Sequence, residues 1–222
     1  MNQAVGQTLA FAVAVGLSPI PIIGVVLMLA TPRARSNGPA FLAGWVAGLA
    51  TLGTIVLLIS GGADAAEGGP ADWVNFLKLA LGAALLWLAL KQWRGRPRAG
   101  EEPELPSWMR SVDHFTAGRA ASLGIALSAI NPKNLVLVVG AAATIAQTGA
   151  AAGKQAIALA IFILIGSIGT GLPILLYFAL GERSKRVLDE LKAWMAHNNG
   201  TIMAVICLLI GAKLIGDGIS GF

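Results

Sequence analysis

Long apolar stretches, separated by short polar segments, divide the chain along almost its whole length. A helix needs about 20 consecutive apolar residues to cross a bilayer. On this criterion the sequence predicts six transmembrane spans, at about residues 4–30, 39–60, 73–91, 120–148, 155–180 and 199–219. Strands of a membrane barrel would instead alternate in polarity over roughly ten residues. We therefore expect an all-α integral membrane protein.

The first and fourth spans are longer than one crossing needs, and each contains proline near its centre. The prolines belong to two tetrapeptides, Ser18-Pro19-Ile20-Pro21 and Asn131-Pro132-Lys133-Asn134. Proline removes a backbone donor and clashes with the carbonyl one turn earlier. Each of these spans is therefore predicted to consist of two half-helices joined by a break. Two shorter surface helices are expected at about 106–115 and 184–197.

The two halves of the chain carry similar features in the same order, although the match is weak residue by residue. The matching pairs are Ser18-Pro19 with Asn131-Pro132, Gly48 and Gly53 with Gly166 and Gly171, and Gly82 with Gly211. Because each half has three spans, the second half must enter the membrane inverted relative to the first. The predicted organisation is a first repeat at 1–93, a cytoplasmic linker at 94–118 and a second repeat at 119–222. Inverted repeats with broken helices are typical of secondary transporters.

Composition and charge indicate the compartment and the orientation. Hydrophobic residues make up 56% of the 222 residues and charged residues only 12%, which excludes an ordinary soluble domain. Most basic residues lie in or beside the loops after the first, third and fifth spans, whereas Asp64, Glu67 and Asp72 lie on the opposite side. The positive-inside rule then places both termini on the outer side of the membrane. Topology thus explains the net charge of +5, and nucleic acid is not expected as a partner.

The two proline tetrapeptides define the candidate site. A broken helix leaves backbone amides and carbonyls that need water, ligand or side-chain partners inside a bilayer. An ionisable side chain at that depth usually marks a functional site, and the starts of half-helices add partial positive charge. We expect an electropositive midplane site that favours a carboxylate, sulfate or phosphate; the alternative is a pair of structural kinks, with Ser18 capping its own turn. The expected substrate-binding residues are Ser18, Pro19, Pro21, Asn131, Pro132, Lys133 and Asn134.

A second charged pair lies in the sixth span. Lys213 and Asp217 are four residues apart and so share one face of a helix. They form either an interfacial ion pair or a proton-coupling site. The spans contain no catalytic triad, metal-ligand cluster or paired carboxylates, and the single Cys207 excludes a membrane carrier with two thiols. We expect neither an enzyme nor a metal or other cofactor.

The six spans, the Pro-x-Pro break at 18–21 and the Asn131-Pro132-Lys133 motif resemble the LysE superfamily of exporters over nearly the whole chain. Within it, the segments 129–135 and 31–35 and the glycine-rich fifth span are similar to the sulfolipid-1-addressing and peptidoglycolipid-addressing proteins of actinobacteria. The resemblance implies an inner-membrane protein that helps to move a cell-envelope lipid or glycolipid outward. Pro-Ile-Pro replaces the Pro-Gly-Pro of amino-acid exporters, which argues against a small amino acid as substrate.

Three functions are compatible with the sequence. The leading one is a secondary transporter that exports an amphiphilic lipid or glycolipid with a polar or anionic head group by alternating access, with Lys133 and the half-helix ends holding the head group. The second is export of a small amino acid or metabolite, and the third is a non-transporting scaffold of a lipid export machine. The expected partners are membrane lipids, the transported substrate, a second copy in a homodimer and the export machinery.

Overall fold

The computed structural model describes residues 2–62, 72–97 and 106–221, and within these ranges the chain is helical with no strand. Asp64 and Glu67, and the part of the linker at 98–105, lie outside the described residues. The helices are α1 (Asn2–Gly16), α2 (Pro19–Leu29), α3 (Ala34–Gly62), α4 (Asp72–Arg94), η1 (Ser107–His114), α5 (Ala117–Ile125), η2 (Ala126–Ile130), α6 (Pro132–Ala146), α7 (Ala152–Gly166), α8 (Ile168–Leu180), η3 (Gly181–Arg183) and α9 (Ser184–Ile219). The all-helical fold predicted from the sequence is confirmed for this part of the chain.

The apolar helices are those of a membrane protein. Three helical stretches in the described residues are long and apolar enough to span a bilayer, namely Ala34–Ser60, Val74–Arg94 and Ile168–Ile219. Two bent pairs, Asn2–Gly16 with Pro19–Leu29 and Ala117–Ile130 with Pro132–Ala146, raise the number to five if each pair is one span. Six spans remain a prediction.

Residues 155–180, expected as one span, are divided at Ser167 into α7 and α8. Two features weaken a continuous helix here. Gly166, Gly169 and Gly171 lie in or beside this junction, and glycine lowers helix stability because it loses the most backbone freedom on folding. Pro173 lies inside α8 and cannot donate to the carbonyl one turn earlier.

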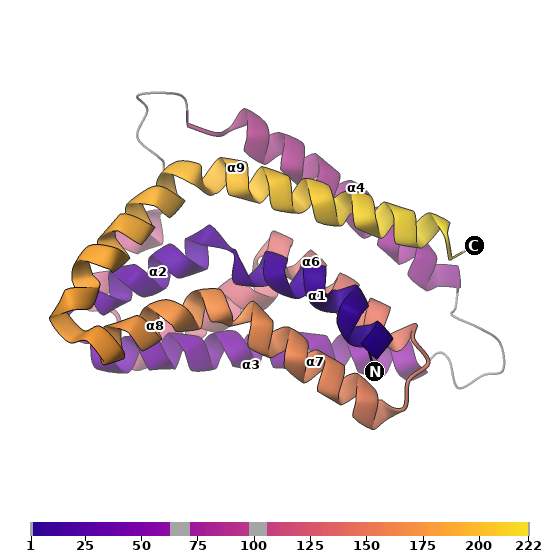
Figure 1. Cartoon of the computed structure of the whole chain (residues 1–222), viewed down its shortest axis with the longest axis horizontal. Helices are drawn as coiled ribbons and strands as arrows, with labels where there is room; N and C mark the ends of the chain where they lie inside the picture. Colours follow the sequence, from indigo (N-terminus) through magenta and orange to yellow (C-terminus); the bar gives the residue numbers. More distant parts are fainter. Residues whose placement is uncertain (1, 63–71, 98–105, 222) are drawn as a thin grey trace.

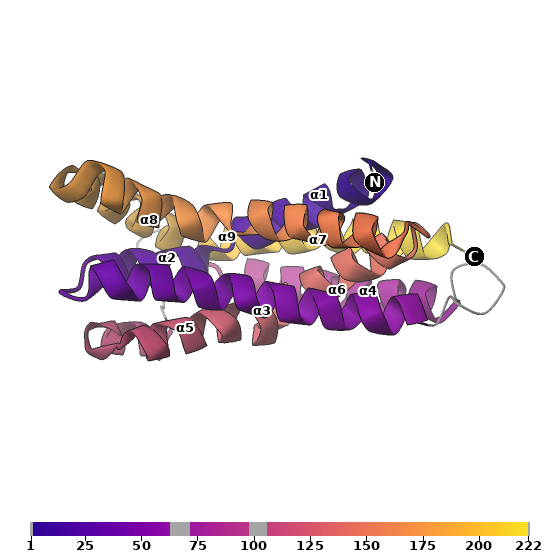
Figure 2. The same ribbon diagram turned by 90° about the horizontal axis from the view of Figure 1, so that it is seen from below.

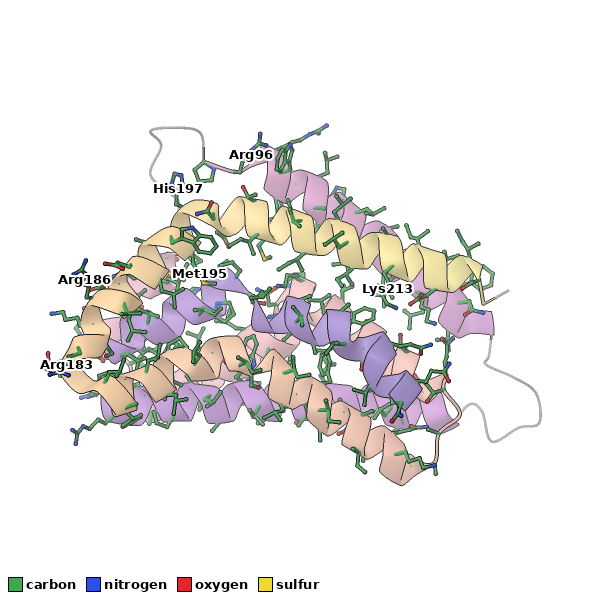
Figure 3. All side chains as sticks on the ribbon, viewed as in Figure 1. Arg96, Arg183, Arg186, Met195, His197 and Lys213 are labelled. Carbon is green, nitrogen blue, oxygen red and sulfur yellow. The ribbon has the colours of Figure 1, made fainter. Side chains whose placement is uncertain are left out.

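The last third of the chain also departs from the sequence expectation. The surface helix predicted at 184–197 and the span predicted at 199–219 form one 36-residue helix, α9. In Figure 1 the chain turns back between α8 and α9, and α9 then bends before it runs beside α4. The bend lies close to His197, which is labelled in Figure 3. The polar first part and the apolar second part of α9 therefore point in different directions.

The helices pack with the two proline segments at the centre. Helix α4 lies along α9, α3 packs against α5 and α6, and α1 packs against α6 and α7. Figure 1 shows α1 and α2 between the α4–α9 pair and the α7–α8 pair, and Figure 2 shows α5 on the other side of α3. The largest fully buried apolar side chains include Phe11, Phe41, Trp45 and Phe162. Both chain ends lie at the same end of the molecule in Figure 1.

Candidate functional site

The first proline segment leaves one backbone carbonyl of α1 without its helical partner. The chain bends by 48° between α1 and α2. The amide of Ser18 donates to the carbonyl of Val15 at 3.2 Å, and the Ser18 hydroxyl donates to the same oxygen at 2.7 Å. In a regular helix the Ser18 amide would donate to Ala14 instead. The Ala14 carbonyl is therefore free to accept from elsewhere.

Lys133 takes up this free carbonyl. Its Nζ donates to the oxygen of Ala14 at 2.9 Å and to the hydroxyl of Ser18 at 2.7 Å. The side chain crosses from the start of α6 to the end of α1, and Lys133 is only 2% exposed. An ammonium group at the C-terminal end of a helix is favoured by the helix dipole as well as by the hydrogen bond. Lys133 thus joins the two proline segments directly.

The second proline segment also leaves a backbone carbonyl without its helical partner, and a side chain of the same segment donates a hydrogen bond to it. The chain bends by 62° between Ala117–Ile130 and α6. The amide of Asn131 donates to Ala126 at 3.0 Å, one residue further back than in an α-helix. The carbonyl of Leu127 is thereby released, and Nδ2 of Asn134 donates to it at 2.8 Å. Oδ1 of Asn134 also lies 3.1 Å from the Ser18 hydroxyl, so Ser18 contacts both Lys133 and Asn134.

The structure brings together only part of the predicted site. Ser18, Lys133 and Asn134 form one buried hydrogen-bonded cluster, which we call the central cluster together with the Ala14 and Leu127 carbonyls. Pro19 and Pro21 are buried at the start of α2. Oδ1 of Asn131 accepts from the Lys133 amide at 3.2 Å and caps α6. Pro132 is exposed, so its contribution is the break itself.

Sequence reasoning missed the two carbonyls, although a signal for them existed. Ser18 and Asn131 directly precede the first proline of their segments. Ala14 and Leu127 lie four residues before Ser18 and Asn131, respectively. Proline disfavours helical geometry in the residue before it, so the amide of that residue is displaced from its regular acceptor. Counting back from each proline would have identified both oxygens.

The central cluster is electropositive and has no carboxylate. None of the ion pairs made by the described residues involves Lys133. Its partners are neutral dipoles, which satisfy an ammonium group's hydrogen-bonding needs but do not cancel its charge. The start of α2 offers few backbone donors, because Pro19 and Pro21 lack an N–H. The charge available to a ligand here therefore comes mainly from Lys133.

Lys213 and Asp217 lie elsewhere, in a second polar cluster. They form an ion pair on α9, and Nζ of Lys213 lies 5.2 Å from the centre of the Phe11 ring. Nearby on α4, Lys78 donates to the Gln147 side chain, and Gln147 donates to Asn75 at 3.2 Å. We call Asn75, Lys78, Gln147, Lys213 and Asp217 the end cluster.

Gln147 of the end cluster is one helix length away from Lys133. Lys133 lies in the first turn of α6 and Gln147 follows its end, a distance of about 20 Å along a helix. The predicted coupling pair is thus not part of the central cluster. In the described residues no group of three or more His, Cys, Asp or Glu side chains is placed to hold a metal ion.

An apolar groove lies beside the second proline segment. It has a volume of about 220 Å³ and lies between α3 and the α5–η2 stretch. Its lining includes Gly48, Thr51, Ile125 and Ala129. Ala129 is two residues from Leu127, whose carbonyl belongs to the central cluster, so an apolar chain in this groove would lie near that cluster.

A comparison with protein families gave one match, and two other comparisons gave none. The family model described as SfLAP (Sap, sulfolipid-1-addressing protein) matches residues 8–220. No curated protein and no solved structure matches the chain. The matched range includes every residue of the central and end clusters.

Proposed function

This chain belongs to the sulfolipid-1-addressing protein family, and from that premise we propose that it is a secondary transporter of an amphiphilic cell-envelope lipid or glycolipid with a polar or anionic head group. Family membership indicates a role in lipid export. In our proposal the chain is not an enzyme, and it moves its substrate by alternating access at the central cluster, between two inverted repeats. It has six spans, with both termini outside a bacterial inner membrane.

The observation that carries this proposal is the buried Lys133 shared by two helix breaks. Its Nζ is held by the Ala14 carbonyl and the Ser18 hydroxyl, which are neutral acceptors. A sulfate, phosphate or carboxylate makes stronger, charge-assisted hydrogen bonds to an ammonium group. An anionic head group would therefore displace these acceptors from Lys133. This exchange would loosen the contact between α1 and α6.

The hydrogen bonds at the two breaks support an inverted repeat. The register that pairs Ser18 with Asn131 also pairs Ala14 with Leu127. These are the two carbonyls released at the breaks, and both are filled from α6, by Lys133 and Asn134. The equivalence thus extends from the prolines to the released carbonyls, whereas the side chains that fill these carbonyls both come from α6.

Glycine contacts support the same register. A Cβ at Gly48 would meet Ile125 and Ser128, and a Cβ at its predicted counterpart Gly166 would meet Ala12 and Val15. The register of the breaks pairs Ala12 with Ile125 and Val15 with Ser128. The contact of α3 with the first half-helix of the second repeat is thus reproduced by α7 on α1.

The contact between α4 and α9 supports a two-fold relation. A Cβ at Gly82 would lie 2.9 Å from the Gly211 oxygen, and one at Gly211 would lie 3.0 Å from the Gly82 oxygen. The neighbouring side chains follow the same pattern: Gly82 faces Ile215, and Gly211 faces Leu86. The register that pairs Gly82 with Gly211 also pairs Leu86 with Ile215. Two equivalent residues that contact each other in this way are expected on the axis that relates two inverted repeats.

The distribution of charge supports the proposed orientation. Figure 3 places Arg96, Arg183 and Arg186 at the end of the molecule opposite to the two termini. The end cluster lies toward the termini, where Figure 3 labels Lys213. With both termini outside, the arginines would face the cytoplasm, as the positive-inside rule requires. The end cluster would then close the outer side of the protein by joining α4 to α6 and α9.

The test is lipid movement in proteoliposomes that contain only this protein. Lys133→Met retains much of the side-chain length without the charge, and Lys154→Met, at an exposed position, is the matched control. The proposal predicts that wild type and Lys154→Met move a fluorescent anionic lipid between leaflets, and that Lys133→Met slows this at least about tenfold. Wild type that moves no lipid would favour the scaffold alternative. Wild type that transports an amino acid but no lipid would favour the metabolite alternative.

A further inference from the structure

Helices α4 and α9 pack along each other, and two of their close contacts lie on either side of a stretch with exposed apolar side chains. The first contact joins Gly82 and Gly211. The second is at Gly200, where a Cβ would lie 2.9 Å from Cβ of Arg96 and 3.2 Å from the oxygen of Gln92. Small residues allow such close approach of two membrane helices. From Gly200 to Gly211, α9 rises about 16 Å.

An apolar groove occupies the space between these two contacts. Its volume is about 510 Å³. Its lining residues are Leu86, Ala89, Leu90, Trp93, Ala204, Val205 and Leu208. Its lining residues lie between the two close contacts along both helices, so the groove would admit a narrow apolar chain lying along the helices.

Two basic side chains lie over indole rings in this part of α4 and just after it, and one of these rings, that of Trp93, lines the groove. Nζ of Lys91 lies 5.4 Å from the centre of the Trp87 ring, and the Arg96 guanidinium lies 3.7 Å from that of Trp93. None of the ion pairs that the described residues make involves Lys91 or Arg96. The indole rings thus position two cations near this stretch of α4, and the charge of Arg96 lies beside a residue that lines the groove.

We propose that this groove is a binding site for an anionic lipid of the cytoplasmic leaflet, separate from the central cluster. An acyl chain would lie against Leu90, Val205 and Leu208, and the acidic head group would contact Lys91 and Arg96. Basic pockets between helices on the cytoplasmic side are suited to acidic lipid head groups. A neutral lipid would fill the groove without using its charge. The assignment to the cytoplasmic leaflet rests on the orientation given in the proposed function, whereas binding of an anionic lipid in detergent requires neither that orientation nor transport.

The direct test is native mass spectrometry of the full chain in detergent. The protein is mixed with equal amounts of dioleoyl phosphatidylglycerol and dioleoyl phosphatidylcholine, which have the same acyl chains and differ in net charge. Each basic residue near an acidic head group favours its binding by about fivefold. With two such residues, we expect about 25-fold more bound phosphatidylglycerol than phosphatidylcholine.

Two variants separate the roles of the groove and of its charge. Val205→Trp fills the groove and should remove the bound lipid, whereas Ile157→Trp, at a similarly exposed position on α7, should not. Lys91→Gln with Arg96→Gln should equalise the two lipids, whereas Arg35→Gln with Arg183→Gln should not. Equal binding of both lipids to wild type, or unchanged binding to Val205→Trp, would overturn the proposal. The proposal would also be overturned if wild type formed a dimer without bound lipid and Val205→Trp dissociated that dimer, because the groove would then bind a second copy of the chain.

Discussion

Ser18 is the residue on which the hydrogen bonds of the central cluster converge. Its hydroxyl contacts the Val15 carbonyl, the Asn134 side chain and Nζ of Lys133, and the residue is buried. The sequence alone left open whether Ser18 binds substrate or caps its own turn. In the structure it does cap its own turn, because its hydroxyl donates to the Val15 carbonyl. It also contacts Lys133, so the cap and the predicted binding role share one side chain.

The Ser18→Ala substitution tests the energetic value of this cluster. It leaves the Lys133 ammonium with one fewer acceptor and the Val15 carbonyl with one fewer donor. A buried polar group that loses its partner costs about 1–3 kcal/mol, so we expect the free energy of unfolding in detergent to fall by that amount. Ser36→Ala removes the same kind of hydrogen bond, to the carbonyl three residues earlier, at an exposed position. Equal effects of the two substitutions in denaturant titrations would contradict the account.

The Asn134→Asp substitution tests whether transport needs an unpaired charge on Lys133. It would place a carboxylate 3.1 Å from the Ser18 hydroxyl that Lys133 also contacts, where a salt bridge could form. Such a bridge would compete with an anionic head group for Nζ. We predict loss of anionic lipid movement in proteoliposomes with a folded protein by circular dichroism. Wild-type transport by the variant would show that Lys133 does not hold the head group.

At the scale of helices, the sequence predicts the proline breaks inside helices better than it predicts the other helix boundaries. Proline has a local steric effect, so the positions of Pro19 and Pro132 could be read directly from the chain. The end of α7 at Ser167 is marked only by the nearby glycines and Pro173, which lie in a run as apolar as a continuous span, and so the sequence predicts this run as one helix. Likewise, the polar residues of 184–197 predict a separate helix, yet no proline or cap separates them from the rest of α9. The partners of Ala14 and Leu127 depend on packing between distant helices, which local patterns do not encode.

The close contact between α3 and α5 predicts a specific sensitivity to volume. A Cβ at Gly44 would overlap the backbone of Ala121, whereas one at Gly216 on α9 would meet nothing within 4 Å. Overpacking of this kind costs about 1–3 kcal/mol, and Ala stabilises an exposed helical position relative to Gly by about 0.5–1 kcal/mol. We therefore expect Gly44→Ala to lower the thermal midpoint in detergent and Gly216→Ala to leave it unchanged or raise it. A midpoint unchanged by Gly44→Ala would refute the packing of α3 on α5.

At the scale of the whole molecule, orientation follows from charge rather than from contacts. The account places both termini and residue 154 outside, and residue 183 inside. Cys207 is buried, so single cysteines introduced at either position should be labelled without interference from it. In intact cells, a membrane-impermeant maleimide should label Lys154→Cys and not Arg183→Cys. The reverse pattern would invert the topology and move the end cluster to the cytoplasmic side.

The central claim is that Lys133 holds the anionic head group of the exported lipid. Its most direct test is the ratio of transport rates for a sulfated glycolipid and for its desulfated form, measured in proteoliposomes with wild-type protein and with Lys133→Met. The account predicts that wild type moves the sulfated lipid at least about tenfold faster and that Lys133→Met loses this preference. A preference for the sulfated lipid that Lys133→Met retains in full would contradict it.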